Sequence, residues 1–369
     1  MLFSKKIKEF IEKIIKDSVS PLLEAQDDFS KSVEASLKEQ KAELLRQDRK
    51  LENLSKMLDS MNSREIRNFF TISRDFKNEN ENKKTYWQGY PKATGNLRII
   101  QLANNALLKR FKIYCDEIGA QFWLHGGSLV GSLRHKGFVP WDDDIDIAMM
   151  RKDFENVKNT LNSENGVYRI QEYYYIGLAC RSYRFVRTDI DSNCFVDIFV
   201  YDNYELRNES EFLDWKALCK NKLELKKIQP DLCVKLKSFP QEPLLIGFTE
   251  LKSALDDCFE RYISDSKSQD EKSSYILWGI DNNYEDESRF AWNYGRIFKR
   301  NDIFPLKSSE FEGEKYSIPN NFDKYTFAEY GIAYDDLSPN FGQSIHLNQY
   351  FRTQEQLDLA NKLIYLEQS

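Results

Sequence analysis

The residues best suited to chemistry are four aspartates, Asp142, Asp143, Asp144 and Asp146, which fall within a span of five positions. Alternate side chains of a strand share a face, so Asp142, Asp144 and Asp146 are expected to point one way. Carboxylates this close repel one another, and without a cation some must take up protons. A hard divalent ion, Mg²⁺ or Mn²⁺, relieves the repulsion and commonly shares its coordination with substrate phosphates. The pattern favours a metal site for phosphoryl transfer, although acidic runs are also common in exposed loops.

The sequence around the acids supports the metal site. Isoleucines interleave with the last acids, which is typical of a half-buried strand rather than a solvated loop. Gly126, Gly127 and Ser128 precede them and predict a turn whose N–H groups and hydroxyl could bind phosphate oxygens. Arg134 and Lys136 lie between the turn and the acids, where positive charge would complement a diphosphate.

One further acid, Asp197, lies downstream in the apolar run CFVDIFVYD. An unpaired carboxylate among apolar side chains is costly, so Asp197 needs a partner. One interpretation makes it a metal ligand or the general base for an attacking hydroxyl. The alternative pairs it with a nearby arginine such as Arg187, which is also a candidate substrate-binding residue.

Alternating helical and strand patterns must position these side chains. Apolar spacing predicts helices and strands in turn, and the first helix is expected to stop at Gly119. The expected helices are 97–118, 128–137 and 151–163, and the expected strands are 120–125, 143–150 and 194–202. The alternation indicates an α/β (α+β) fold with a mixed sheet.

The N-terminal 62 residues differ from the rest of the chain in their sequence pattern. Residues 1–16 predict a basic amphipathic helix, which could lie on an anionic bilayer or pack against protein. Leucines then recur every seven positions, at Leu37, Leu44, Leu51 and Leu58. This repeat predicts a coiled coil and hence a homo-oligomer. The lysine-rich stretch 211–237 is either a solvated helix face or a binding surface for a membrane or an anionic acceptor.

Composition narrows the class of protein. Hydrophobic residues make up 41% of the 369 residues, enough for a packed core. The formal net charge of −6 argues against a general nucleic-acid binder. Six cysteines without a Cys-x-x-Cys pair, with three histidines, do not suggest a structural zinc site. Without a visible cleavable signal or an apolar run of about 20 residues, we expect a cytoplasmic protein, soluble or peripheral on the inner face of the membrane.

The stretch WLHGGSLVGSLRHKGFVPWDDDIDIAMMRKDF closely resembles the signature of the LicD family, which includes the fukutin and fukutin-related proteins. VRTDIDSNCFVDIFVYD is similar to the family's second acidic strand, and FEGEKYSIPNNFDKYTFAEYG to its C-terminal block. The likeness covers residues 96–340. We therefore expect a helical region 1–62, a linker 63–95, a catalytic domain 96–345 and a helical tail 346–369.

The resemblance implies a nucleotidyltransferase-type fold and transfer of a phosphorylated alcohol from a CDP-alcohol to a sugar hydroxyl of a cell-surface glycan, releasing CMP. The alcohol phosphate is typically phosphocholine in LicD relatives and ribitol phosphate in fukutin-type relatives. The acceptor would belong to lipopolysaccharide, capsule or teichoic acid. The family's Gly-Ser turn corresponds to Gly127 and Ser128, and its acidic pair to Asp144 and Asp146. Its third carboxylate corresponds to Asp197, and an additional aspartate near the metal to Asp142. Ser128 stands where many members have threonine, which keeps the hydroxyl.

Two other functions stay open. The same fold could transfer the nucleoside monophosphate instead, or the chain could be a non-catalytic, membrane-tethered scaffold for glycan assembly. The transferred alcohol is equally open. Tyr173, Tyr174 and Tyr175 could present aromatic faces to a quaternary ammonium, but consecutive strand residues do not share a face, so at most two could cooperate.

Overall fold

The computed structural model describes residues 13, 16, 40, 83, 85, 87–163, 166–175, 180–204, 257, 260, 273–279, 281–282, 297–331, 333–336, 351 and 353–368. Contacts divide the chain into two units, Met1–Asn62 and Ser63–Ser369. The amphipathic helix and coiled coil predicted for the first unit lie outside the described residues, apart from three isolated positions, as does the lysine-rich stretch 211–237. None of the helices in the described ranges is both long enough and apolar enough to cross a bilayer.

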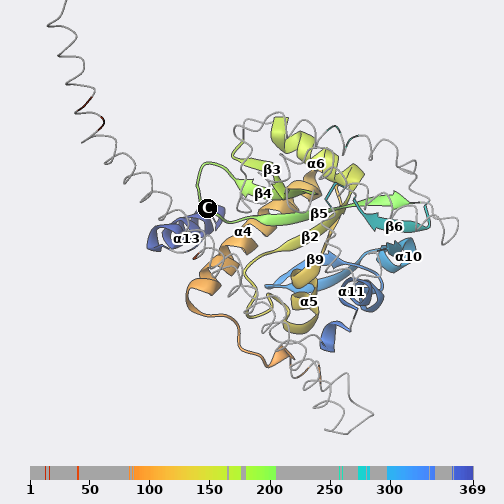
Figure 1. Ribbon diagram of the computed structural model, residues 1–369. Helices are drawn as coiled ribbons and strands as arrows, with labels where there is room; N and C mark the ends of the chain where they lie inside the picture. The colour runs from red at the N-terminus through yellow and green to blue at the C-terminus, as the bar shows by residue number, and fades with distance from the viewer. Residues whose placement is uncertain are drawn as a thin grey trace, which may run out of the picture. The chain divides into compact units, whose positions relative to one another are not determined.

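A mixed sheet forms the centre of the second unit (Figure 1). Its strands are β1 (Phe122–Leu124), β2 (Asp146–Met150), β3 (Tyr168–Tyr175), β4 (Cys180–Arg187), β5 (Val196–Tyr204), β6 (Tyr275–Trp278) and β7 (Ile297–Lys299). Their order is β1-β2-β5-β4-β3, and β6 pairs with both β5 and β7. The β2–β5 pair is parallel and the other pairs are antiparallel, which confirms the mixed α/β sheet expected from the sequence.

Two helices cover one face of this sheet. The helices are α4 (Gly95–Ile118) and α6 (Arg151–Ser163). Phe111 of α4 lies 5.1 Å from Phe185, and Phe154 of α6 lies 4.4 Å from Tyr183, measured between ring centroids. Tyr183 and Phe185 are two positions apart on β4 and therefore share a face. Helix α4 ends as predicted, because Gly119 takes the left-handed conformation (φ 72°) that glycine adopts readily.

The opposite face carries the polar chemistry. Successive β5 residues alternate, so Asp197, Phe199 and Tyr201 point away from α4 and α6. Helix α11 (Phe322–Tyr330) lies over this face, where Tyr325 contacts the Tyr201 hydroxyl at 3.3 Å and stacks on Phe298. Helix α5 (Gly126–His135) follows β1 beside it. The remaining elements here are α10 (Arg300–Ile303), the hairpin β8 (Lys307–Phe311) and β9 (Glu314–Ile318), and the short helix η3 (Tyr334–Asp336).

Two outlying segments of the second unit, helix α13 and the stretch around Trp87, are tied to its body. Helix α13 (Gln354–Gln368) packs on α4 (Figure 1), and its buried Glu367 accepts hydrogen bonds from Tyr168, Arg110 and Arg187. Trp87, in the stretch interpreted as a linker, is only 1% exposed. The Trp87 side chain is therefore packed, unlike a side chain of a free linker. The polar residues around it in sequence gave no sign of this burial.

A buried polar cluster fills the space where β4 and β6 diverge along the same edge of β5. Asp281 is completely buried and accepts hydrogen bonds from Arg151 at 2.6 Å, Arg181 at 3.1 Å and the Tyr183 hydroxyl at 2.6 Å. Burial opposes ionisation, but the two guanidinium groups outweigh it and hold the pKa of Asp281 well below its usual value. Asp281 is therefore an ionised anchor for this part of the sheet.

Candidate functional site

The predicted acidic residues meet where two parallel strands begin. Asp146 on β2 and Asp197 on β5 are directly opposite in the register. Carboxylate oxygens of Asp144, Asp146 and Asp197 lie within 4.8 Å of one another. A second group with the same spread joins Asp142, Asp143 and Asp144. The structure thus gathers the predicted ligands and adds Asp143, which strand alternation had directed to the other face.

The acidic segment is a loop up to Asp146 rather than a strand from 143. Two amide side chains of α4 hold it: Gln101 Nε2 donates to the Asp142 carbonyl, and Asn104 Nδ2 donates to the Asp143 carbonyl, both at 2.8 Å. Asn104 Oδ1 also accepts the N–H of Phe195, at the entrance to β5, at 3.0 Å. One buried amide therefore links the two acidic segments. The only sequence signal was a pair of polar residues on the apolar face of a helix.

The electrostatics of the acids suit a cation. Burial raises the pKa of Asp142 well above its usual value, and the charges of Asp144, Asp146 and Asp143 raise it further. Burial likewise raises the pKa of Asp146, with added repulsion from Asp144, Asp197 and Glu329. A positive charge would relieve the repulsion among these carboxylates. All of the donor atoms are oxygens, which Mg²⁺ and Mn²⁺ prefer as ligands. The residues present therefore fit a divalent ion.

The Gly-Gly-Ser stretch is the first turn of α5, not a turn that precedes a helix. His125 is the N-cap, and the first backbone hydrogen bond of the helix runs from the Leu129 N–H to the His125 carbonyl at 2.9 Å. The N–H groups of residues 126–128 are thus left outside the helical ladder, an arrangement that attracts anions. Gly127 N–H approaches Asp146 Oδ2 at 3.3 Å, and Ser128 Oγ accepts the Asp146 N–H at 3.0 Å.

The two predicted cations of this segment lie elsewhere. Arg134 and Lys136 are at the C-terminal end of α5, about 12 Å along the axis from Gly126 at 1.5 Å per residue. Arg134 is buried over the Trp87 ring, 3.9 Å from its centroid, and Lys136 Nζ lies 3.7 Å from Glu310. The structure does not bring them to the phosphate-binding end of the helix, because the helix separates positions that are near in sequence.

Asp197 is paired with a different arginine from the one expected. Arg184, directly opposite Asp197 in the β4–β5 register, donates its Nε–H to Asp197 Oδ1 at 2.7 Å. Arg187, three positions further on, instead binds Asp189 at 2.7 Å and Glu367 at 2.9 Å. The pairing of Asp197 with Arg187 was therefore wrong, and the contacts of Arg187 do not include the acidic residues of the site. The register of two antiparallel strands decides which arginine is used.

His125 and Glu329 were missed as functional candidates by sequence reasoning. His125 is buried behind the acids, with Nε2 3.0 Å from Glu329 Oε1 and Nδ1 2.8 Å from the Tyr325 hydroxyl. His125 precedes the glycine pair directly, but its partners come from α11, 200 positions away in the case of Tyr325. No local pattern indicates such a contact.

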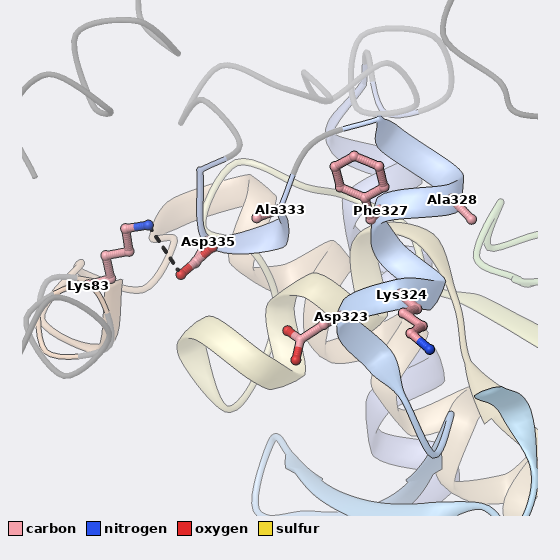
Figure 2. Close-up of a pocket in the computed structure, with 7 residues that line it drawn as sticks. All are labelled: Lys83, Asp323, Lys324, Phe327, Ala328, Ala333 and Asp335. Carbon is pink, nitrogen blue, oxygen red and sulfur yellow. Dashed lines mark ion pairs between the residues drawn. The ribbon is translucent and has the colours of Figure 1, made fainter. Parts of the chain in front are cut away.

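A surface pocket of about 640 Å³ lies on the outer side of α11 (Figure 2). Its lining includes Phe327, which is 50% exposed, and the ion pair between Lys83 and Asp335 at 3.6 Å. Tyr325 and Glu329 are on the buried side of the same helix, toward His125. The helix therefore stands between this pocket and the acidic residues.

The fold and site define an α/β protein with an acidic centre at the start of two parallel strands, beside a helix N-terminus. Residues 119–230 match the family model described as LicD/FKTN/FKRP, nucleotidyltransferase domain. The chain is 34% identical over 118 residues to the lipopolysaccharide cholinephosphotransferase LicD of Haemophilus influenzae, covering 29% of this chain and 44% of that protein. It is 40% identical over 51 residues to the ribitol 5-phosphate transferases FKRP of mouse and human, covering 14% of this chain and 10% of each of them.

Residues 119–230 therefore carry a domain of the LicD family, as the signature motif had indicated. The chain spans less than half the length of the bacterial relative and a tenth of the mammalian ones. All the gathered aspartates, from Asp142 to Asp197, fall inside the matched residues 119–230. The named relatives are transferases of alcohol phosphates by their descriptions.

Proposed function

We propose that this protein transfers a phosphorylated alcohol, phosphocholine or a similar group, from a CDP-alcohol to a sugar hydroxyl of a cell-surface glycan, with release of CMP. The observation that carries the proposal is the grouping of Asp144, Asp146 and Asp197 within 4.8 Å, beside the N-terminus of α5. The names of the bacterial and mammalian relatives support an alcohol phosphate as the transferred group.

Asp144, Asp146 and Asp197 would hold Mg²⁺ or Mn²⁺, with Asp142 adjacent. When bound, such an ion neutralises charge on the donor diphosphate and on the departing CMP. The raised pKa values of Asp142 and Asp146 support a cation, because protonation is the other way to relieve the repulsion.

The remaining tasks fall to groups of this chain. The Gly127 N–H contacts Asp146 Oδ2, and it would orient phosphate oxygens together with the N–H groups of Gly126 and Ser128 in the same first turn of α5. Ser128 Oγ already accepts the Asp146 N–H, so its own proton is directed to another oxygen. Arg184 fixes the Asp197 carboxylate by a charge-assisted hydrogen bond.

The test is a panel of CDP-alcohols (choline, ethanolamine, glycerol and ribitol) incubated with the full chain, Mg²⁺ and a glycan acceptor. We expect CMP release and transfer of an alcohol-side label to the acceptor. The double substitution Asp144→Ala/Asp146→Ala should reduce transfer about 1,000-fold or more, because a metal supplies several kcal/mol of charge stabilisation. Its Mn²⁺ binding, followed by electron paramagnetic resonance, should fall in parallel.

Asp116→Ala is the matched control, since this aspartate is exposed on α4 and paired only with Lys112. Full activity of the double variant would refute the site. A nucleotide-side label on the acceptor would establish nucleotidyl transfer instead. Absence of transfer with every donor, together with membrane recruitment of the chain, would favour the scaffold.

A further inference from the structure

Helix α11 brings a buried carboxylate to the N-terminus of α5. The side chain of Glu329 is 4% exposed, and its Oε1 lies 3.0 Å from His125 Nε2. A carboxylate accepts hydrogen bonds only, so His125 donates its Nε2–H to Glu329. His125 Nδ1 contacts the Tyr325 hydroxyl at 2.8 Å, and this hydroxyl accepts the Trp123 indole N–H at 3.1 Å. Side chains of β1 and α11 thus fix the orientation of the Glu329 carboxylate.

The second carboxylate oxygen of this residue, Oε2, is buried without a hydrogen-bond partner among the described residues. Burying an unsatisfied carboxylate oxygen is costly, and such an atom in a site commonly awaits a ligand. Glu329 is close enough to the acids for its charge to raise the pKa of Asp146. The ring of His125, its partner, lies 4.5 Å from that of Phe199, on the same face of β5 as Asp197. Glu329 therefore lies next to the acidic centre, with Oε2 its unsatisfied oxygen.

Asp197, one candidate for the base from sequence, is already engaged. One of its oxygens accepts the Arg184 Nε–H, and the residue is part of the three-carboxylate group that fits a cation. The positive charges of a guanidinium and of a bound cation stabilise the ionised carboxylate and so make it a weaker base. Glu329 differs from Asp197 because only its Oε1 is engaged, by His125 Nε2, and because it is not one of the three carboxylates grouped for a cation.

We propose that Glu329 is the general base of this protein, accepting the proton of the acceptor hydroxyl on Oε2, with His125 as a positioning residue. This inference rests on the proposed transfer reaction. The acceptor O–H bond breaks as its proton moves to Oε2, and the acceptor oxygen bonds to the phosphorus of the alcohol phosphate. The bond from that phosphorus to the bridging oxygen breaks, and its electron pair leaves on CMP. Glu329 then passes the proton to water.

The first test compares Glu329→Gln with Glu329→Asp. Glutamine keeps the size and an acceptor for the His125 Nε2–H but cannot take a proton at neutral pH. We expect its kcat to fall about 100- to 10,000-fold, as for loss of general-base catalysis. Its donor KM and Mn²⁺ affinity should stay close to wild type. The acid limb of the pH–rate profile should disappear in Glu329→Gln and persist in the slower Glu329→Asp.

The second test is chemical rescue. Glu329→Ala leaves space for a small carboxylate, so added formate should restore part of the transfer rate, whereas Glu329→Gln leaves no space and should not respond. His125→Asn should lower kcat but keep the acid limb, because the base is still present. Full kcat in Glu329→Gln would overturn the assignment. The assignment would also be overturned if Glu329→Gln lost Mn²⁺ binding or thermal stability to the same extent as its rate, and if formate did not restore the rate of Glu329→Ala. An inactive wild-type protein would instead refute the transfer reaction itself.

Discussion

Alanine at Gly127 should disable the acidic centre without unfolding the protein. A Cβ at this position would lie 2.1 Å from Asp142 Oδ2 and 3.3 Å from its Cγ. The three atoms nearest to this Cβ all belong to the Asp142 side chain, so the substitution displaces the carboxylate rather than the backbone. Gly131, four positions on in the same helix, is the contrast, since its Cβ would meet the Gly137 carbonyl at 2.3 Å and the Val139 nitrogen at 2.9 Å.

The magnitudes follow from what must move. The Asp142 carboxylate has to shift by about 1 Å or more to reach ordinary contact distance, and displacements of that size in a site cost about 100-fold in rate. Alanine gains about 1 kcal/mol over glycine in a helix, which offsets the cost of rotating one side chain. Gly127→Ala should therefore unfold with a free energy within about 1 kcal/mol of wild type. Gly131→Ala should lose about 1–3 kcal/mol, because backbone cannot rotate away.

The assay measures three quantities on the same preparations: the free energy of unfolding in urea, Mn²⁺ affinity, and the rate of CMP release. Gly127→Ala should lose activity and keep its stability. Gly131→Ala should lose stability and keep near-normal kcat in its folded fraction. Wild-type Mn²⁺ affinity and CMP release in Gly127→Ala would show that Asp142 does not support the centre. An unfolded Gly127→Ala would show that the close approach is structural.

Two further predictions concern stability. Asp281→Asn should destabilise by about 3 kcal/mol in urea unfolding, because two buried guanidinium groups lose their fully buried partner, although Arg151 keeps Asp202 and Arg181 keeps Glu260. Asp189→Asn at an exposed pair should cost about 0–1 kcal/mol, and equal losses would contradict this account of the buried cluster. Burial, aided by the charge of Arg134, lowers the pKa of His135 from 6.5 to about 4, so the unfolded chain binds more protons between these values and stability falls as pH drops through that window. Relative to His135→Gln, the wild-type protein should lose about 3 kcal/mol between pH 6.5 and 4, and parallel pH profiles of the two proteins would refute the assignment.

Much of the site could be predicted because its parts are local in sequence. Asp144 and Asp146 are two positions apart, so they stay close together in space although only Asp146 lies in β2. Asp197 was identifiable as an acid inside an apolar strand, where a charge needs a partner. The glycine pair was recognised, but its low helix propensity suggested a turn, whereas the structure uses both glycines to open α5 against the carboxylates.

The errors share one cause. Arg134 and Lys136 are near the glycines in sequence but lie a helix length away in space, since each residue advances the axis by about 1.5 Å. Arg184 rather than Arg187 meets Asp197 because the register of two strands sets the pairing. The Trp87 side chain looked like part of a linker, because nothing beside it in sequence shows that Arg134 lies under its ring.

The sequence by itself determined the acidic centre, the mixed α/β class and the family, since spacing within a strand or a motif is carried by the chain before it folds. Only the tertiary structure decided which groups surround the acids: the amides of Gln101 and Asn104, the guanidinium of Arg184, and the pair of His125 with Glu329. These contacts join elements far apart in the chain. Their partners are chosen by strand register and by the packing of α4 and α11 on opposite faces of the sheet, which no local pattern records.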